Sequence, residues 1–312
     1  MSSQATSIYS VQFDIVHGCQ LKCVGCPNST LISDVERISV ANFDIALRNI
    51  DVERIHTLRL FNFGEPLLHQ QLAEIVECIP RQDWKVSVVE LSTNAQKVNW
   101  DDFEEMVKSE VVTRLVVSCD GDGTAEDYER LRPPSRWERL VEFLERARQL
   151  RDRWAPGMQL VTRTVCNPEP PEFRERWRNY LQPLGWTPEF RRWMALPESV
   201  MNMTGRQINP PQGECGFMQE ASVFEGHPWH GQINLLYVDA DGTVVPCCMH
   251  PRAGVLGNLF QQTFSEILGS QQRADFVSKM RLDRASIPAC GKCEMGPVGN
   301  EGASFWASMD IA

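Results

Sequence analysis

The sequence predicts an α/β protein in which a partial (β/α)6 TIM barrel, open on one side, precedes a smaller C-terminal domain. Three observations predict this: alternating strand and helix patterns, a break in that alternation after Pro197, and 11 cysteines that fall largely into two sets. We expect the barrel domain to span residues 1–200 and the second domain to span residues 201–312.

Six strand patterns alternate with helical ones through the first two thirds of the chain. Apolar runs predict strands at 10–16, 57–63, 86–91, 114–118, 158–165 and 189–194. Helical periodicity lies between them at 40–49, 71–79, 100–108, 137–154 and 172–184. Strands that alternate with helices form a parallel sheet, and six units are too few to close a full barrel.

The pattern changes in the last third. Residues 198–232 are rich in Gly, Pro, Asn and Met and indicate a linker and loop segment. The Asp-Gly turn at 239–242 lies between apolar runs at 233–238 and 243–246, which predicts a β-hairpin. A helix is expected at 264–279, before the last cysteine pair.

Composition narrows the classes of function. The chain is 42% hydrophobic, as expected of a globular protein, and its net charge of −10 argues against nucleic acid as a partner. The N-terminus lacks a secretory pattern and no apolar run reaches about 18 residues, so we expect a cytoplasmic protein without a membrane partner. Thiols stay reduced in that compartment, so metal or cluster ligation explains the cysteines better than disulfides.

The first cysteine set directly follows the first predicted strand. Cys19, Cys23 and Cys26 form a CxxxCxxC motif. Three thiolates can hold a four-iron cube and leave one iron open for a bound molecule. Spacing alone leaves a structural zinc site as the alternative.

Further short motifs follow at successive strand ends. They are Phe63-Gly64-Glu65-Pro66, Ser92-Thr93-Asn94, Ser118-Cys119-Asp120-Gly121 and the run from Tyr128 to Pro133. Together with CxxxCxxC, this order resembles the radical S-adenosylmethionine (SAM) superfamily. Two positions depart from the common family pattern: Phe63 replaces the first glycine of GGEP, and Gly25 stands where an aromatic residue is frequent.

The resemblance implies a set of cofactor contacts. Cys19, Cys23 and Cys26 would hold a SAM-binding 4Fe–4S cluster. SAM itself would be bound by Gly64, Glu65 and Pro66 at its amino group, by Asn94, by Ser118 at the ribose or carboxylate, and by Arg132 at the carboxylate.

The second cysteine set resembles the SPASM/twitch extension of the same superfamily, over about residues 213–295. It comprises Cys247 after the hairpin, Cys290-Gly291-Lys292-Cys293, and Cys215 before the hairpin. The resemblance implies one auxiliary 4Fe–4S cluster held by Cys215, Cys247, Cys290 and Cys293. Two alternatives remain open: Cys248 as a ligand in place of Cys215, and zinc in place of iron.

Three residues are candidates to act on the substrate. Cys248 is supernumerary and next to a ligand, so it can donate a hydrogen atom to a substrate radical; Cys166 is the rival donor. Arg163 lies on the fifth predicted strand and can hold a polar or anionic substrate, or SAM.

Four other residues of interest have a different standing. We expect Cys78 and Cys119 to serve packing, while His17 and Trp193 are further candidates because they lie at strand ends.

The resemblance implies an enzyme that cleaves SAM to a 5′-deoxyadenosyl radical, with a flavodoxin or ferredoxin as reductant. The expected substrate is a small polar molecule, an aminocyclitol- or sugar-like intermediate of natural-product biosynthesis, which is oxidised, dehydrated or epimerised. The alternatives are modification of a ribosomal peptide or protein side chain, and a non-catalytic metal-binding scaffold.

Overall fold

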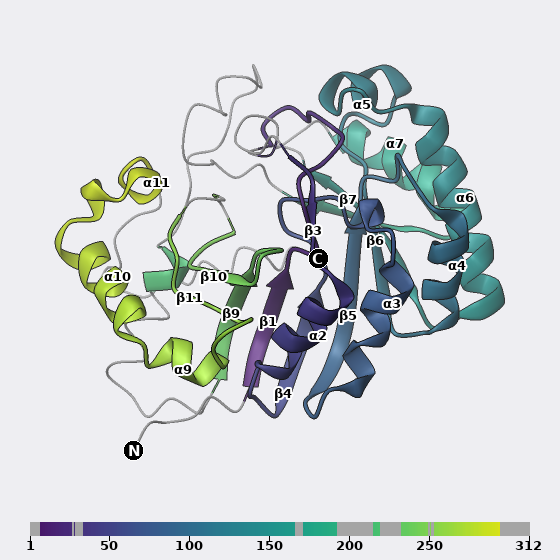
Figure 1. The fold of residues 1–312 in the computed structure, drawn as a ribbon. Coiled ribbons are helices and arrows are strands. Elements are labelled where there is room, and N and C mark those ends of the chain that lie inside the picture. The colour runs from purple at the N-terminus through teal and green to yellow at the C-terminus, as the bar shows by residue number, and fades with distance from the viewer. Residues whose placement is uncertain are drawn as a thin grey trace.

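The protein is built around one large, mostly parallel sheet (Figure 1). The computed structural model describes residues 7–26, 28, 34–165, 171–191, 215–218, 232–248, 250 and 253–293. The sheet has nine strands in the order β11-β10-β9-β1-β4-β5-β6-β7-β8. Their bounds are β1 Ser7–Phe13, β4 Arg54–Arg59, β5 Lys85–Thr93, β6 Arg114–Ser118, β7 Gln159–Val165, β8 Thr187–Arg191, β9 Gln232–Val238, β10 Thr243–Val245 and β11 Gly257–Asn258.

The strands β1 and β4 to β8 pair in parallel, which confirms the predicted open (β/α)6 barrel. The predicted hairpin is also present, as β9 and β10. It continues the barrel sheet, because β9 pairs in parallel with β1. A separate two-stranded sheet joins β2 (Val16–His17) to β3 (Glu36–Arg37).

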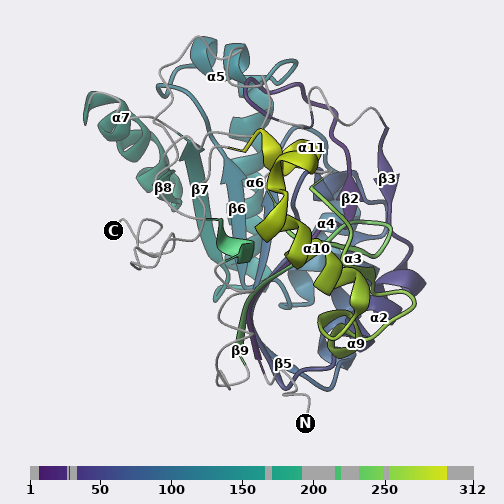
Figure 2. The ribbon, with the colours of Figure 1, turned by 90° about the vertical axis from the view of Figure 1, so that its left-hand side faces the viewer.

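Helices cover one face of the barrel sheet, and the C-terminal helices lie beyond its β9–β11 edge (Figures 1 and 2). The helices over the barrel are α2 Val40–Arg48, α3 Leu72–Glu77, α4 Trp100–Lys108, α5 Ala125–Leu131, α6 Trp137–Trp154 and α7 Pro171–Leu181. The C-terminal ones are α9 Phe264–Leu268, α10 Gln271–Leu282 and α11 Pro288–Gly291. Short 3-10 turns lie at η1 Pro66–Leu68, η2 Ile79–Arg81, η3 Gln182–Leu184 and η5 Arg284–Ser286. Among the described helices, none combines the length and apolar character needed to cross a bilayer.

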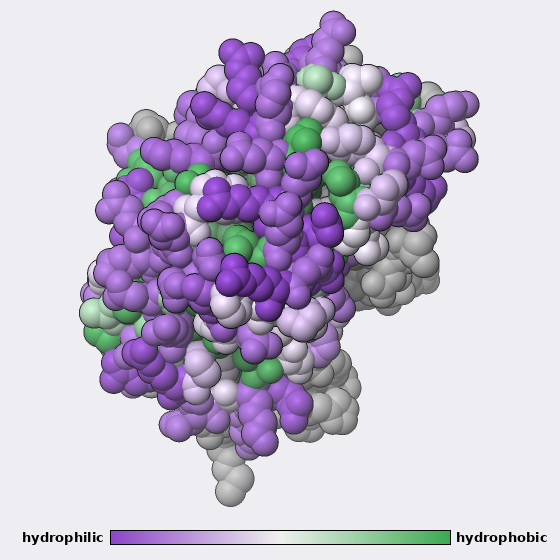
Figure 3. Space-filling model, turned by 90° about the vertical axis from the view of Figure 1, so that its right-hand side faces the viewer, coloured by the Kyte–Doolittle hydropathy of each residue, from purple (hydrophilic) through white to green (hydrophobic). Residues whose placement is uncertain are grey.

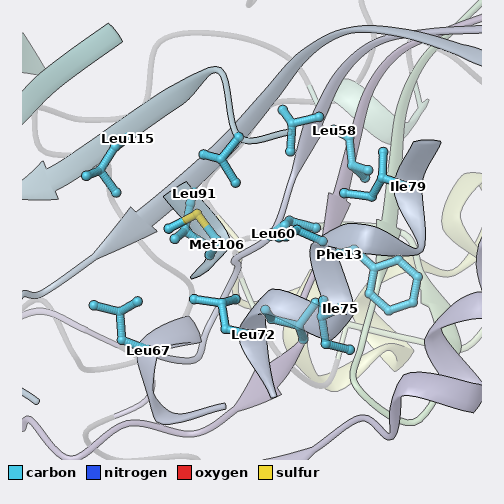
Figure 4. Close-up of a cluster of buried hydrophobic side chains, with 14 of the residues drawn as sticks. Phe13, Leu58, Leu60, Leu67, Leu72, Ile75, Ile79, Leu91, Met106 and Leu115 are labelled. Carbon is cyan, nitrogen blue, oxygen red and sulfur yellow. The ribbon is translucent and has the colours of Figure 1, made fainter. Parts of the chain in front are cut away.

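The main core lies between the helices and the sheet. Leu58, Leu91 and Leu115 of neighbouring strands are fully buried and lie near the α3 residue Ile75 and the α4 residue Met106 (Figure 4). The outer surface of the helix layer, which faces away from the sheet, is largely hydrophilic (Figure 3).

Strand side chains alternate between the two faces of a sheet. The residues next to these leucines, Arg59, Glu90 and Arg114, therefore project from the face opposite the helices. We call this the inner face of the barrel.

Several elements end where the sequence predicts, and others do not. Strand β6 and helices α4 and α6 have the predicted bounds. The first strand ends earlier than predicted, at Phe13, because the Asp14 carboxylate accepts N–H bonds from the Phe63–Gly64 loop. The single helix expected at 264–279 is wrong: Gly269 ends α9, and Ser270 caps α10 by accepting the Arg273 N–H at 3.1 Å.

Candidate active site

The first cysteine loop is fastened at the carboxyl end of the sheet. It leaves β2 through Gly18, which has a φ of +100° and where an added Cβ would lie 2.3 Å from the Asp34 carbonyl oxygen, so there is no room for a side chain. The backbone N–H of Lys22 donates to the Pro133 carbonyl at 2.6 Å, and that of Val24 donates to the Leu131 carbonyl at 2.8 Å. The loop that carries the cysteines is thereby bound to the end of α5.

The thiols of Cys19, Cys23 and Cys26 lie near one another: Cys23 and Cys26 both raise the pKa of Cys19, and Cys26 raises that of Cys23. Burial is the larger cause and raises the pKa of Cys19 to about 12 and that of Cys23 to about 11. The N–H of Leu21 and the amide of Asn94 donate to the Cys19 Sγ at 3.4 and 3.3 Å. Three sulfur donors on one anchored loop fit a cluster with three protein ligands, and binding it must release the thiol protons.

The Gly64 backbone packs directly against the first cysteine segment. A Cβ at Gly64 would lie 1.4 Å from the Val16 carbonyl oxygen, so only glycine fits. The fully buried Asp14 carboxylate accepts the N–H of Gly64 at 3.1 Å and that of Phe63 at 3.3 Å. Asn28 donates to the Phe63 carbonyl from the other side. These hydrogen bonds thus fix the position of the Phe63–Pro66 loop relative to the sheet.

Glu65 joins this loop to the end of β5. Its carboxylate accepts the Thr93 hydroxyl at 2.6 Å, the Asn94 N–H at 2.7 Å and the Leu67 N–H at 3.0 Å. Burial raises the pKa of Glu65 to about 7 against these donors. By accepting the Asn94 N–H and capping η1, which begins at Pro66, the Glu65 carboxylate positions both segments.

The end of β6 contributes Ser118 and Asp120. Ser118 is half-buried and pairs in register with Arg163 of β7. Asp120 accepts the Val165 N–H at 2.9 Å and forms a buried ion pair with Arg132. Burial lowers the pKa of Arg132, but Cys23 and Asp120 more than offset this and keep it well above its usual range. The guanidinium is therefore a fixed positive charge beside the first cysteine set.

The buried Asp14 and the half-buried Asp239 form a cluster with His17 beside the cysteine loop, and the sequence predictions did not include this cluster. The Asp14 carboxylate contacts the His17 ring nitrogen at 3.2 Å, and ligand atoms of Asp14, His17 and Asp239 lie within 4.8 Å of one another. Burial, and after it the charge of Asp14, raise the pKa of Asp239 to about 7. Asp14 directly follows a buried strand and has no neighbouring basic residue in sequence, which is the signal that could have marked it.

Three cysteines of the second set, Cys215, Cys290 and Cys293, lie close to α10. Burial is the larger cause that raises the pKa of Cys290 to about 11, and the nearby Cys215 and Cys293 contribute to this rise. Cys293 also raises the pKa of Cys215, so the three thiols lie near one another. Arg284 donates to the carbonyl oxygens of Cys290 at 2.9 Å and Cys293 at 3.1 Å. Three thiols beside an arginine fit the expected cluster ligands. That Cys247 is the fourth ligand stays a prediction.

Cys248 has different neighbours from this group. It is half-buried at the end of the β9–β10 hairpin, and its side chain hydrogen bonds to that of Tyr237. Arg59 is close enough to lower its pKa, although burial raises it overall. Tyr237 pairs in register with Gln12, whose own partner on β4 is Arg59, so these contacts direct Cys248 toward the inner face.

The remaining predicted residues have varied placements. Arg163 lies on the inner face, with Glu90 at 3.5 Å and Glu189 at 3.3 Å. Cys78 and Cys119 are fully buried, as expected of packing residues. Cys166 and Trp193 lie outside the described residues, and none of the described cysteines forms a disulfide.

Comparison with known proteins gives two family matches. Residues 14–165 match the radical SAM superfamily, and residues 231–294 match SPASM, an iron–sulfur cluster-binding domain. No curated protein sequence matches the chain.

Solved structures show the same fold. A structure of anSMEcpe with bound AdoMet is 14% identical with a TM-score of 0.59, over 92% of this chain and 89% of that one. BtrN in complex with AdoMet and 2-DOIA is 16% identical with a TM-score of 0.51, over 92% of each chain. The chain belongs to the radical SAM superfamily and carries a C-terminal SPASM domain. Its cofactors are accordingly SAM, a 4Fe–4S cluster in the barrel domain and auxiliary iron–sulfur in the SPASM domain.

Gly64→Ala tests the close approach of the second motif. The added methyl group would overlap the Val16 carbonyl, so we expect a loss of about 3 kcal/mol or more in the free energy of unfolding, together with weakened SAM binding. Denaturant titration and equilibrium SAM binding measure the two effects. Gly157→Ala is the matched control, because nothing lies within 4 Å of its added methyl group. Equal behaviour of the two variants would contradict the packing argument.

Metal content tests both cysteine sets. Anaerobically reconstituted protein should hold about eight irons, four per cluster. Changing Cys19, Cys23 and Cys26 together to Ala should leave about four, while Cys78→Ala should leave the count unchanged. Iron and zinc are measured by plasma mass spectrometry. Zinc without iron would contradict the assignment of both sets.

Proposed function

We propose that the protein reductively cleaves SAM and abstracts a hydrogen atom from a small polar substrate bound on the inner face of the barrel. The observation that carries this proposal is the convergence of motifs from separate strand ends on one cysteine loop. Asn94 donates to the Cys19 Sγ, Glu65 accepts from Asn94, and the segment around Arg132 binds the loop backbone. When bound, the cluster supplies one electron that splits SAM into methionine and the 5′-deoxyadenosyl radical.

The residues around the cysteine loop have two kinds of role in this proposal: some bind SAM, and others position those that do. The Gly64–Pro66 backbone and Ser118 bind and orient SAM, and Arg132 supplies a fixed positive charge near Cys23 for the SAM carboxylate. Asp14 and Glu65 position these groups by holding the loop between them. We place the reaction in the cytoplasm with a flavodoxin or ferredoxin as electron donor, because thiol ligands need a reducing compartment.

The inner face favours a small substrate of the aminocyclitol or sugar type. Arg163, Glu90 and Glu189 make it strongly polar, which suits hydroxyl-rich molecules better than apolar ones. BtrN, of similar fold, is recorded in complex with 2-DOIA. The second candidate is a peptide substrate, since anSMEcpe is recorded with bound AdoMet and a peptide. A purely structural scaffold would need none of this polarity facing the interior.

SAM cleavage is the direct test. Reduced, cluster-loaded protein mixed with SAM should form 5′-deoxyadenosine, measured by anaerobic liquid chromatography. The Cys19, Cys23 and Cys26 triple Ala variant should form none, because it has no thiolate left to bind the cluster. Cys78→Ala, a buried cysteine far along the sequence from either set, is the control and should stay active. Product from the triple variant, or none from the wild type, would refute the proposed function.

Cys248 decides between the possible outcomes of the reaction. In an epimerisation, its thiol gives a hydrogen atom to the substrate radical, and the resulting thiyl returns to a thiol with one electron from the external reductant and one proton. Its contacts with Tyr237 and Arg59 favour a place facing the substrate. In an oxidation, the substrate radical would instead lose a proton and one electron, which the auxiliary iron–sulfur held by the second cysteine set would accept, and the thiol would not be consumed. We favour the oxidative outcome, because it explains why the chain keeps a second cysteine set.

The Cys248→Ala variant separates these outcomes. It should keep the iron content and 5′-deoxyadenosine formation of the wild type in either case. If the reaction is an oxidation, Cys248→Ala should keep the product yield of the wild type, and Cys290→Ala should lose it. If the reaction is an epimerisation, Cys248→Ala should lose the inverted product and the deuterium that this product takes from the solvent. Mass spectrometry of products formed in deuterated water measures this. Loss of about four irons in Cys248→Ala would mean that Cys248 is a ligand and Cys215 the spare thiol.

A further inference from the structure

The inner face of the barrel carries a connected layer of charged side chains from five adjacent strands. We call it the charged layer; its members are Arg59, Glu90, Arg114, Arg163, Glu189 and Arg191. They occupy facing register positions: Arg59 faces Glu90 and Glu90 faces Arg114, while Arg163 faces Glu189. Barrel interiors are usually filled by branched apolar side chains. This layer therefore needs a reason beyond packing.

Glu90 is the buried centre of the layer, with its side chain only 2% exposed. Its carboxylate lies 3.6 Å from the Arg59 Nε, 3.5 Å from the Arg114 Nε and 3.5 Å from a terminal nitrogen of Arg163. Arg59 also donates to the Ser10 hydroxyl at 2.7 Å. Three guanidinium groups thus share one carboxylate, which they hold at distances at or beyond those of a direct hydrogen bond.

Glu189 is the second carboxylate of the layer and is likewise shared. It contacts Arg163 and Arg191 at 3.3 Å each, and it also pairs with Arg114. Burial alone would raise the pKa of Glu189, but the three arginines lower it below its ordinary value. Glu189 is therefore ionised near neutral pH and already counts among the negative charges.

The charges of the layer do not balance. Among the described residues, the guanidinium groups of Arg59, Arg114 and Arg163 face the carboxylates of Glu90 and Glu189, which leaves one positive charge in excess before Arg191 is counted. Each guanidinium has five N–H donors, far more than two carboxylates can accept, and the buried Arg163 Nε has no acceptor among the described residues. The side chains of Arg59, Arg114 and Arg163 are 31%, 25% and 21% exposed, so these donors are sheltered yet reachable. A sheltered excess of positive charge costs free energy unless an anion completes it.

We propose that the charged layer binds an anionic oxygen group of the substrate, a carboxylate or a phosphate. This inference rests on the proposed function and narrows its substrate to a small acidic molecule. Glu90 on β5 lies four residues before Asn94, which directly follows the end of this strand, so the layer is about 13 Å below the cysteine loop. The substrate accordingly places its anionic group deep in the barrel and its reacting C–H bond toward the carboxyl end. Arg132, which lies beside Cys23, remains the partner of the SAM carboxylate.

Four sugars that differ mainly in charge test the proposal. Glucose 6-phosphate, glucuronate, glucose and glucosamine are titrated into the cluster-loaded, SAM-bound protein at constant ionic strength, with calorimetry as the readout. The phosphate or the carboxylate, or both, should bind about tenfold or more tightly than glucose, as expected for charge-assisted hydrogen bonds, and glucosamine should bind most weakly. Which of the two acids binds identifies the anionic group. Equal affinities, or no binding by any of the four, overturn the proposal.

Variants assign the effect to the layer. Arg163→Gln should weaken acid binding about tenfold, which is more than it weakens glucose binding, and should leave SAM affinity unchanged. Arg59→Gln, which touches only one of the two carboxylates, is the second variant if the first does not fold. Arg48→Gln removes an equal charge from the exposed face of α2 and should have no effect.

The outcomes separate this proposal from the proposed function. A loss of SAM affinity in Arg163→Gln means that the layer serves the cofactor, and it overturns the proposal while SAM cleavage by the wild type still stands. Acid binding that the arginine variants leave intact overturns it as well. Conversely, acid binding in a protein that forms no 5′-deoxyadenosine refutes the proposed function and retains the anion site.

Discussion

The contact between the Gly64 backbone and the Val16 carbonyl brings the second strand-end loop directly against the segment that carries the cysteines. Two carboxylates stabilise this contact. Asp14 accepts the N–H groups of the loop itself, and Glu65 accepts three donors from η1 and the end of β5. Both carboxylates are buried, and burying such groups is unfavourable without donors. Because each is satisfied only when the strand ends are in place, the loop and the cysteines are positioned together.

A second constraint comes from the inner face of the sheet. Apolar side chains there would stabilise the barrel at lower cost than Arg114, Arg163 and Glu90, since paired buried charges seldom improve stability over hydrophobic packing. The sequence keeps these charges while the helix-facing positions Leu58, Leu91 and Leu115 are uniformly apolar. The two faces of the same strands thus serve different purposes: one stabilises the fold, and the other forms a polar interior suited to a ligand.

Local patterns predicted much of this structure. Periodicity placed α4, α6 and β6 at their observed bounds, because these elements have strong apolar stripes and clear ends. Motif order at the strand ends predicted which segments meet at the cysteine loop. Of the charged layer, the sequence predicted only Arg163, because an Arg or Glu at alternate positions of a strand is equally typical of a solvent-facing side chain. Asp14 was missed for a similar reason: its partners are backbone groups about 50 residues away, and they leave no local pattern.

The pairing of β9 with β1 has a consequence for how the two cysteine sets work together. The pattern break after Pro197 predicted a smaller C-terminal domain, and β9, which follows that break, extends the barrel sheet in parallel beside the strand that leads into the first cysteine loop. The Asp14 N–H donates to the Val238 carbonyl at 2.8 Å, and Asp239 follows immediately beside His17. The hairpin that leads to Cys247 and Cys248 is therefore tied through the sheet to the loop of Cys19. A shift of one cysteine-bearing segment would break ladder bonds that the other depends on, so the spacing between the first cysteine loop and the hairpin is a property of the sheet.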